Sequence, residues 1–139
     1  MTKPVRPKSE IGSVKIGMTP ITGGTTMSDF FDRENDAKYD KAYKETTPDI
    51  LKAFGGFNDA VFAEEGREIP LKYRELIAYA VGLTTQCAYC IDAHSNAAVK
   101  AGATETELAE TAWTASAIRA GGAFVHGRLG FKFTGVHEH

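Results

Sequence analysis

From Ser28 onward the chain has no run of β-branched residues, and its prolines in this part, Pro48 and Pro70, both stand where a helix would begin. Proline is favoured at the first position of a helix, because that position needs no backbone donor and the ring fixes a helical φ. Residues with high helix propensity dominate the rest of this part. We therefore predict an all-α fold.

The first 27 residues have a different character. They contain three of the five prolines and four glycines, and their apolar residues follow neither a helical nor a strand period. Proline and glycine at this density are typical of irregular backbone. We expect an irregular N-terminal arm, residues 1–27, and one helical domain, residues 28–139, because 139 residues suit a single domain.

Helix boundaries can be predicted from capping residues and apolar periods. A first helical stretch is expected within residues 28–45. Thr47 can cap the next helix, with Pro48 at its first position. Apolar residues then recur every three or four positions and are expected to face the core: Ile50, Phe54, Phe57 and Val61.

The helix that begins at Pro70 is apolar over most of its circumference and is predicted to be central and buried, so the charged Glu75 within it needs a reason. Gly82 and the polar residues after it suggest a break, with Thr84 or Thr85 capping a helix that runs to about Lys100.

The last long helix is predicted to start at a capping box, since Thr104 and Glu107 have its spacing. Gly121 and Gly122 are candidates for a kink or an end in it. The core is expected to take up four large aromatic residues, some of which could instead line a substrate pocket: Phe54, Phe57, Phe62 and Trp113.

Charge and hydropathy exclude several classes of function. The formal charge is −2, and no basic stripe suited to a phosphate backbone is present, so we do not expect nucleic-acid binding. No apolar run approaches the roughly 18 residues that span a bilayer, and the N-terminus lacks a signal-peptide pattern. We expect a cytoplasmic protein without a membrane partner.

The two cysteines, Cys87 and Cys90, are separated by two residues, which in a reducing compartment suggests redox chemistry or metal binding. At 100° per residue, both cysteines and His94 fall within a helix sector about 60° wide. A neutral imidazole there could take up or return a thiol proton. Helix N-terminal amides favour a Cys87 thiolate, whereas Cys90 is closer to His94, so the two activation routes favour different sulfurs.

Glu75 lies on the preceding helix and could cross the hairpin to hydrogen-bond His94, which would fix the tautomer of the imidazole. Other interpretations stay open. The cysteines could be small buried apolar residues, or part of a zinc site with His94 and a fourth ligand, for which the candidates are His126, His137 and His139.

The spacing of Glu75, Cys87, Cys90 and His94 resembles the signature of the alkylhydroperoxidase AhpD family, within the carboxymuconolactone decarboxylase-like superfamily. The resemblance covers about Thr47 to Gly127. It implies an AhpD-like helical bundle with a single repeat, thiol-dependent reduction of hydrogen peroxide or alkyl hydroperoxides, and assembly as a homotrimer or homohexamer.

By this resemblance Cys90 is the peroxidatic cysteine, Cys87 the resolving cysteine, and His94 with Glu75 a proton relay. Tyr89 stands where the AhpD pattern has a histidine. No flavin, haem or nicotinamide motif is present, so we expect no cofactor and an external dithiol reductant, either a protein or a small thiol. The alternatives are a general thiol-disulfide oxidoreductase, and a zinc-stabilised or redox-sensing binding module.

Overall fold

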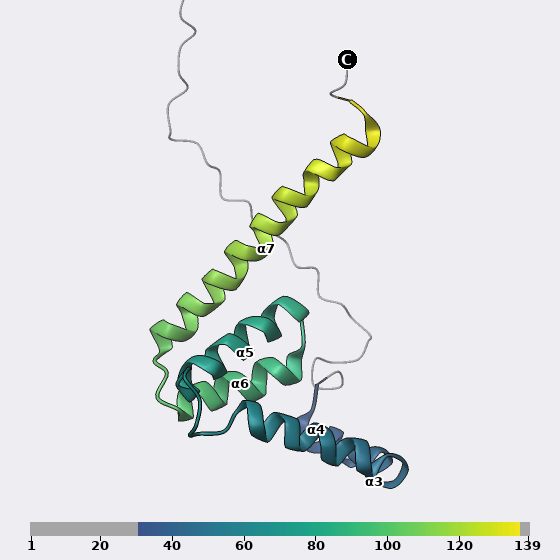
Figure 1. The fold of residues 1–139 in the computed structure, drawn as a ribbon, viewed down its shortest axis with the longest axis vertical. Helices are drawn as coiled ribbons and strands as arrows, with labels where there is room; N and C mark the ends of the chain where they lie inside the picture. The colour runs from purple at the N-terminus through teal and green to yellow at the C-terminus, as the bar shows by residue number, and fades with distance from the viewer. Residues whose placement is uncertain (1–30, 137–139) are drawn as a thin grey trace, which may run out of the picture. The chain divides into compact units, whose positions relative to one another are not determined.

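The computed structural model describes residues 31–136, and within this range it contains helices and no strand (Figure 1). The all-α prediction is confirmed. The predicted N-terminal arm, residues 1–27, lies outside the described residues. The elements in chain order are α2 (Arg33–Asp36), the 3-10 helix η1 (Ala37–Tyr39), α3 (Asp40–Thr46), α4 (Pro48–Val61), α5 (Leu71–Thr85), α6 (Ala88–Lys100) and α7 (Glu105–Thr134).

The first helical stretch is not continuous, because the 3-10 helix at residues 37–39 separates α2 from α3. The side chain of Asp32 caps α2 by accepting a hydrogen bond from the Asn35 amide at 3.1 Å. The chain then passes through Thr47 into α4, which contacts α3 (Figure 1).

Helix α5 is central to the part of the fold that carries the cysteines, because it packs against both α6 and α7 (Figure 1). A small core joins these helices: Leu76, Ala98 and Ala103 are buried, and Leu108 packs against them. Ala98 is fully buried. Alanine at such positions lets helix backbones approach closely, so α5 and α6 are held tightly together.

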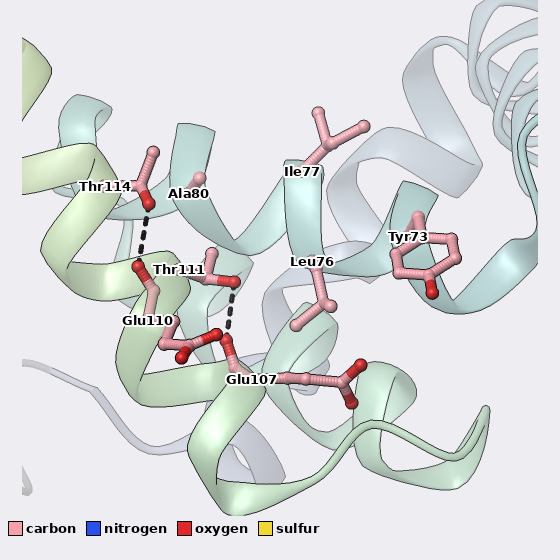
Figure 2. Close-up of a pocket in the computed structure, with 8 residues that line it drawn as sticks. All are labelled: Tyr73, Leu76, Ile77, Ala80, Glu107, Glu110, Thr111 and Thr114. Carbon is pink, nitrogen blue, oxygen red and sulfur yellow. Dashed lines mark hydrogen bonds between the residues drawn. The ribbon is translucent and has the colours of Figure 1, made fainter.

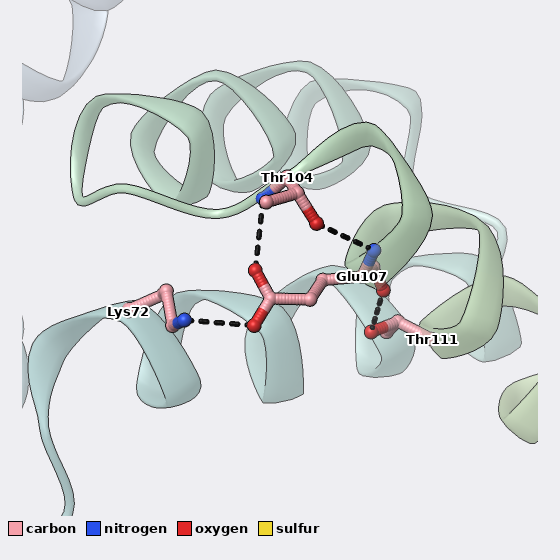
Figure 3. Close-up of polar contacts among 4 residues, drawn as sticks. All are labelled: Lys72, Thr104, Glu107 and Thr111. Carbon is pink, nitrogen blue, oxygen red and sulfur yellow. Dashed lines mark hydrogen bonds and ion pairs between the residues drawn. The ribbon is translucent and has the colours of Figure 1, made fainter.

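An ion pair and a capping box fix the start of α7 against α5 (Figure 3). The Thr104 hydroxyl accepts from the Glu107 amide at 3.1 Å and the Glu107 carboxylate accepts from the Thr104 amide at 2.8 Å, which confirms the predicted box. The same carboxylate accepts from Nζ of Lys72 at 2.7 Å. This hydrogen bond lowers the pKa of Glu107 and raises the pKa of Lys72.

The prediction that the apolar face of α4 is buried in the core is wrong for the single chain. Its four apolar residues are exposed, from Val61 at 37% to Ile50 and Phe57 at 64%. Trp113 on α7, also predicted to be core, is 73% exposed. A helical apolar period shows that one face of a helix is apolar, but the period does not say what covers that face.

Predictions about where helices begin, break or end are also corrected by the structure. Thr47 is the N-cap residue of α4 as predicted, but its hydroxyl donates to the Tyr43 carbonyl and caps no amide of the helix. The predicted break between the two helices occurs at Gln86, after α5 has continued through Gly82. The hydroxyls of Thr84 and Thr85 donate to the Val81 carbonyl in the last turn of α5, so neither caps α6. Helix α7 likewise runs through Gly121 without a break. Helix propensity is a weak predictor wherever tertiary contacts oppose it.

No helix within residues 31–136 combines the length and the apolar character that crossing a membrane requires.

Candidate active site

The two cysteines lie at the start of α6 and are joined in a disulfide, with their Cα atoms 5.2 Å apart. Cys87 is the N-cap residue of the helix, and its sulfur accepts a hydrogen bond from the Cys90 amide at 3.2 Å. The sequence predicted Cys87 within the first turn. As the N-cap, its sulfur faces the unpaired amides directly, so the helix end stabilises negative charge on this sulfur.

A tight turn between α5 and α6 sets the position of Cys87. Gln86 ends α5 in the left-handed conformation, with φ of 57°. The Cys87 amide then donates to the Gly82 carbonyl at 3.1 Å, which satisfies a carbonyl in the last turn of α5. The chain therefore reverses within two residues, and α6 returns alongside α5.

Gly82 is buried where α5 passes the disulfide. A Cβ atom added there would lie 3.2 Å from Cβ of Cys90 and 3.3 Å from the Ile91 backbone nitrogen. These contacts are tighter than ordinary van der Waals packing. Gly82 therefore allows the cysteine-bearing turn to approach α5, a role that sequence reasoning mistook for a helix break.

We predict that Gly82→Ala lowers the free energy of unfolding of the oxidised protein by up to about 2 kcal/mol, because overpacking typically costs about 1–3 kcal/mol and outweighs the higher helix propensity of alanine. The matched control is Gly55→Ala in α4, where nothing lies within 4 Å of an added Cβ. That variant is expected to gain about 0.5–1 kcal/mol. Denaturant unfolding measures both variants, and equal stabilisation by the two would contradict close packing at Gly82.

Glu75 and His94 form the hydrogen bond that the sequence suggested. Nδ1 of His94 lies 2.7 Å from Oε2 of Glu75, and the glutamate is only 6% exposed. An ionised carboxylate can only accept, so Nδ1 carries the hydrogen and Nε2 is the nitrogen left for proton transfer. The buried glutamate is therefore satisfied and fixes the tautomer of the histidine.

The last turn of α4 covers this pair. The ring of Phe62 stacks on the His94 imidazole, with centroids 4.9 Å apart and planes at 30°. A cavity of about 410 Å³ lies beside the imidazole. Three elements line it: Asn58, Asp59 and Phe62 from the end of α4, Glu75 from α5, and Ala93, His94 and Ala97 from α6.

Two arginines hold the end of α4 in place. The guanidinium of Arg74 donates to the carbonyls of Val61 and Ala63, and through Nε to the carbonyl of Ile69 at 2.9 Å. Arg67 donates to the Ala60 carbonyl through Nε at 3.0 Å and through Nη2 at 2.7 Å. Carbonyls at a helix C-terminus need such partners, so these cations fix the turn that carries Phe62.

Tyr89, between the cysteines, points to a different set of partners. Its hydroxyl donates to the Asp36 carboxylate, and its ring lies edge-on to Phe31 with centroids 4.7 Å apart. The hydrogen bond to Asp36 raises the pKa of Tyr89. Tyr89 therefore connects the segment before α3 to the turn that carries the cysteines. A histidine at this position could instead transfer protons.

A second cavity, of about 490 Å³, lies between α5 and α7 (Figure 2). Its floor includes Leu76, Ile77 and Ala80, and the hydroxyls on its α7 side, from Thr111 and Thr114, donate to carbonyls of their own helix (Figure 2). Neither cysteine nor His94 lines it. Of the predicted site residues, Glu75 and His94 line the smaller cavity under α4, and the two cysteines line neither cavity.

The structure brings the residues predicted for the site to adjacent helices: Glu75 on α5, and Cys87, Cys90 and His94 at the start and middle of α6. Their catalytic roles stay predictions. Among residues 31–136, no three or more His, Cys, Asp or Glu side chains are grouped to hold a metal ion. His137 and His139 lie outside this range. Sequence reasoning missed Asn58, Asp59 and Arg74, which carry no motif.

The fold and the site together define a helical protein with a disulfide-bonded cysteine pair on the helix that also carries His94, whose imidazole is hydrogen-bonded to Glu75. The family model of the carboxymuconolactone decarboxylase family matches residues 48–131, and this chain belongs to that family. The matched range begins at the first residue of α4 and ends within α7.

Two bacterial proteins show what the chain is similar to in sequence. Uncharacterized protein 4 in the cox locus of Paracoccus denitrificans is 38% identical over 77 residues, which cover 55% of this chain and 68% of that protein. An uncharacterized protein of Haemophilus influenzae is 47% identical over 51 residues, covering 37% of this chain and 43% of that protein.

Two crystal structures show similar folds. A carboxymuconolactone decarboxylase family protein from Legionella pneumophila has a TM-score of 0.55 and 28% identity, covering 61% of this chain and 74% of its own. A protein from Methanobacterium thermoautotrophicum has a TM-score of 0.58 and 32% identity, covering 64% of this chain and 98% of its own. These matches agree with the all-α architecture.

Proposed function

We propose that this protein is a thiol-dependent peroxidase that reduces hydrogen peroxide or alkyl hydroperoxides through a Cys87–Cys90 disulfide cycle. The observation that carries the proposal is the disulfide beside a histidine whose tautomer is fixed by the buried Glu75. A reversible dithiol and a proton donor on adjacent helices are what such a cycle requires.

In the first step Nε2 of His94 takes the proton of the Cys90 thiol, and the resulting thiolate attacks the terminal oxygen of the peroxide. An S–O bond forms and the O–O bond breaks, so the sulfur is oxidised by two electrons to a sulfenic acid and the peroxide is reduced. The leaving alkoxide or hydroxide takes a proton from His94 and departs as alcohol or water. Cys90 and His94 are one helical turn apart, which places their side chains on the same face of α6.

In the second step the Cys87 thiol condenses with the sulfenic acid, which releases water and forms the disulfide. An external dithiol then reduces the disulfide and is itself oxidised, with one of its thiolates attacking a sulfur of the pair. The Cys90 amide stabilises a thiolate on Cys87, so Cys87 is the better leaving group and the reductant attacks Cys90.

Steady-state consumption of cumene hydroperoxide, with dithiothreitol as the reductant, tests the proposal. Turnover that needs both the peroxide and the dithiol supports it. No consumption above the rate of dithiothreitol alone contradicts it.

The second candidate is a general thiol-disulfide oxidoreductase, which the N-cap position of Cys87 favours because helix N-terminal thiolates exchange readily with disulfides. Reduction of a small aromatic disulfide by the dithiol form, without peroxide turnover, would select this function. A zinc-stabilised or redox-sensing module without turnover would show neither activity, and metal analysis of the purified protein separates the zinc form from the redox form.

We also propose that copies of the chain assemble as a homotrimer or homohexamer. Helix α7 carries large apolar side chains that are strongly exposed in the single chain, at 71–79% exposure: Trp113, Ile118, Phe124 and Phe133. Apolar side chains gathered along one helix in this way mark protein interfaces. Sedimentation equilibrium is expected to give three or six times 15.0 kDa, whereas a mass of 15.0 kDa would contradict assembly.

A further inference from the structure

The cavity under α4 has the size and the composition of a site for a small organic molecule. Its volume, about 410 Å³, lies within the range of small-molecule sites and exceeds what hydrogen peroxide fills. Phe62, Ala93 and Ala97 supply apolar surface, and Asn58, Asp59, Glu75 and His94 supply polar atoms. A molecule that joins an apolar group to a polar reacting end would match the apolar and polar parts of this lining.

His94 connects the cavity to the reacting sulfur. The imidazole lines the cavity and lies four residues after Cys90, on the same face of α6. A hydroperoxide whose organic group lies in the cavity therefore has its oxygens at the His94 end, towards the first turn of the helix. The alcohol formed after O–O cleavage would receive its proton from the histidine and leave through the same space.

The acidic residues in the lining of the cavity are Asp59 and Glu75. The carboxylate of Glu75 accepts the hydrogen bond from Nδ1 of His94 at 2.7 Å and is buried. The side chain of Asp59 makes neither an ion pair nor a hydrogen bond with the residues that the structure describes, and no lysine or arginine is among the described residues of the lining. Asp59 is exposed, and its carboxylate places a negative charge without an ion-pair partner at the edge of the cavity.

The wall that carries Asp59 is held in place. Arg67 and Arg74 bind the carbonyls at the end of α4, and the stack of Phe62 on His94 adds a contact across the cavity edge. The amide of Asn58 donates to the Phe54 carbonyl at 3.0 Å, which fixes the neighbouring side chain. The position of the Asp59 charge relative to His94 is thus set by the fold.

We propose that this cavity receives the organic group of an uncharged alkyl hydroperoxide, and that Asp59 makes it reject hydroperoxides that carry a carboxylate. The inference rests on the proposed peroxidase function and names its substrate class. A substrate carboxylate that came within about 5–6 Å of the Asp59 carboxylate would be repelled enough to change kcat/KM by about 3- to 100-fold, depending on how strongly solvent screens the two charges.

The test compares cumene hydroperoxide with its para-carboxylate derivative, which has the same reacting group and one added negative charge. We expect wild type to prefer the neutral peroxide, and Asp59→Asn to reduce the preference by roughly tenfold. The matched control is Asp49→Asn, which removes an exposed carboxylate from the first turn of the same helix and is expected to leave the preference unchanged. High salt should also reduce the wild-type preference, since it shortens the Debye length from about 10 Å at 0.1 M to about 3 Å at 1 M.

The possible failures are distinguishable. If the wild type consumes neither organic peroxide nor hydrogen peroxide, the proposed function fails and this inference fails with it. If the wild type is active but shows no preference, or if Asp59→Asn and Asp49→Asn keep the same preference, only the role of the cavity and of Asp59 is overturned.

Discussion

Cys90→Ser is expected to lower peroxide turnover on the order of 10³-fold or more, to the background rate. A serine hydroxyl at neutral pH is barely ionised, and its oxygen cannot undergo the two-electron oxidation that converts a thiolate to a sulfenic acid. Stopped-flow consumption of peroxide by the reduced protein measures the effect directly.

Cys87→Ser is the matched control for this prediction. It keeps the attacking sulfur and removes only the partner that forms the disulfide, so the reduced variant should consume one equivalent of peroxide and form a sulfenic acid on Cys90. A sulfenic-acid-specific reagent followed by mass spectrometry locates the modified residue. The reverse pattern, with label on Cys87 in Cys90→Ser, would assign the attack to the N-cap sulfur and overturn our order of roles.

His94→Gln is expected to lower kcat/KM for alkyl hydroperoxides by about 10²–10⁴-fold, which is the usual contribution of a general acid or base. The glutamine amide can still donate to the buried Glu75 carboxylate, so this change avoids the cost of an unpaired buried charge. Melting temperature should therefore change little while activity falls. Wild-type activity in this variant would remove His94 from the mechanism.

Glu75→Gln separates the orienting role from the proton transfer itself. The amide can meet Nδ1 only as a weaker, uncharged partner, so the tautomer of His94 is less firmly fixed and activity should fall by less than in His94→Gln. Because Glu75 acts through His94, we predict that the activity of the double variant is little lower than that of His94→Gln alone. Losses that multiply in the double variant would show that the two residues act independently.

The all-α class could be predicted because local signals agreed with one another. Pro48 stands at the first position of α4, and Thr104 with Glu107 forms the capping box of α7. That α5 continues through Gly82 could not be predicted. The low helix propensity of glycine is visible in the sequence, whereas the contact of Gly82 with Cys90 is not. The apolar face of α4 was predicted to be buried and is exposed, because the spacing of apolar residues along a helix does not show what covers that face.

The same division holds for the candidate site. The spacing of Cys87, Cys90 and His94 within one helix predicts a shared face, and an acidic residue in an apolar helix pointed to the contact between Glu75 and His94. Asp59 comes to this pair only because residues 62–70 bring α5 back past the end of α4. Contacts made through such a connection depend on tertiary packing, and the sequence period does not encode them.

The central claim is that the dithiol of Cys87 and Cys90 is oxidised by peroxide to an intramolecular disulfide. The most direct test titrates free thiols in reduced wild-type protein before and after one equivalent of alkyl hydroperoxide. We expect both thiols of each chain to disappear, one equivalent of alcohol to form, and dithiothreitol to restore the two thiols. Thiols that survive the peroxide unchanged would contradict it.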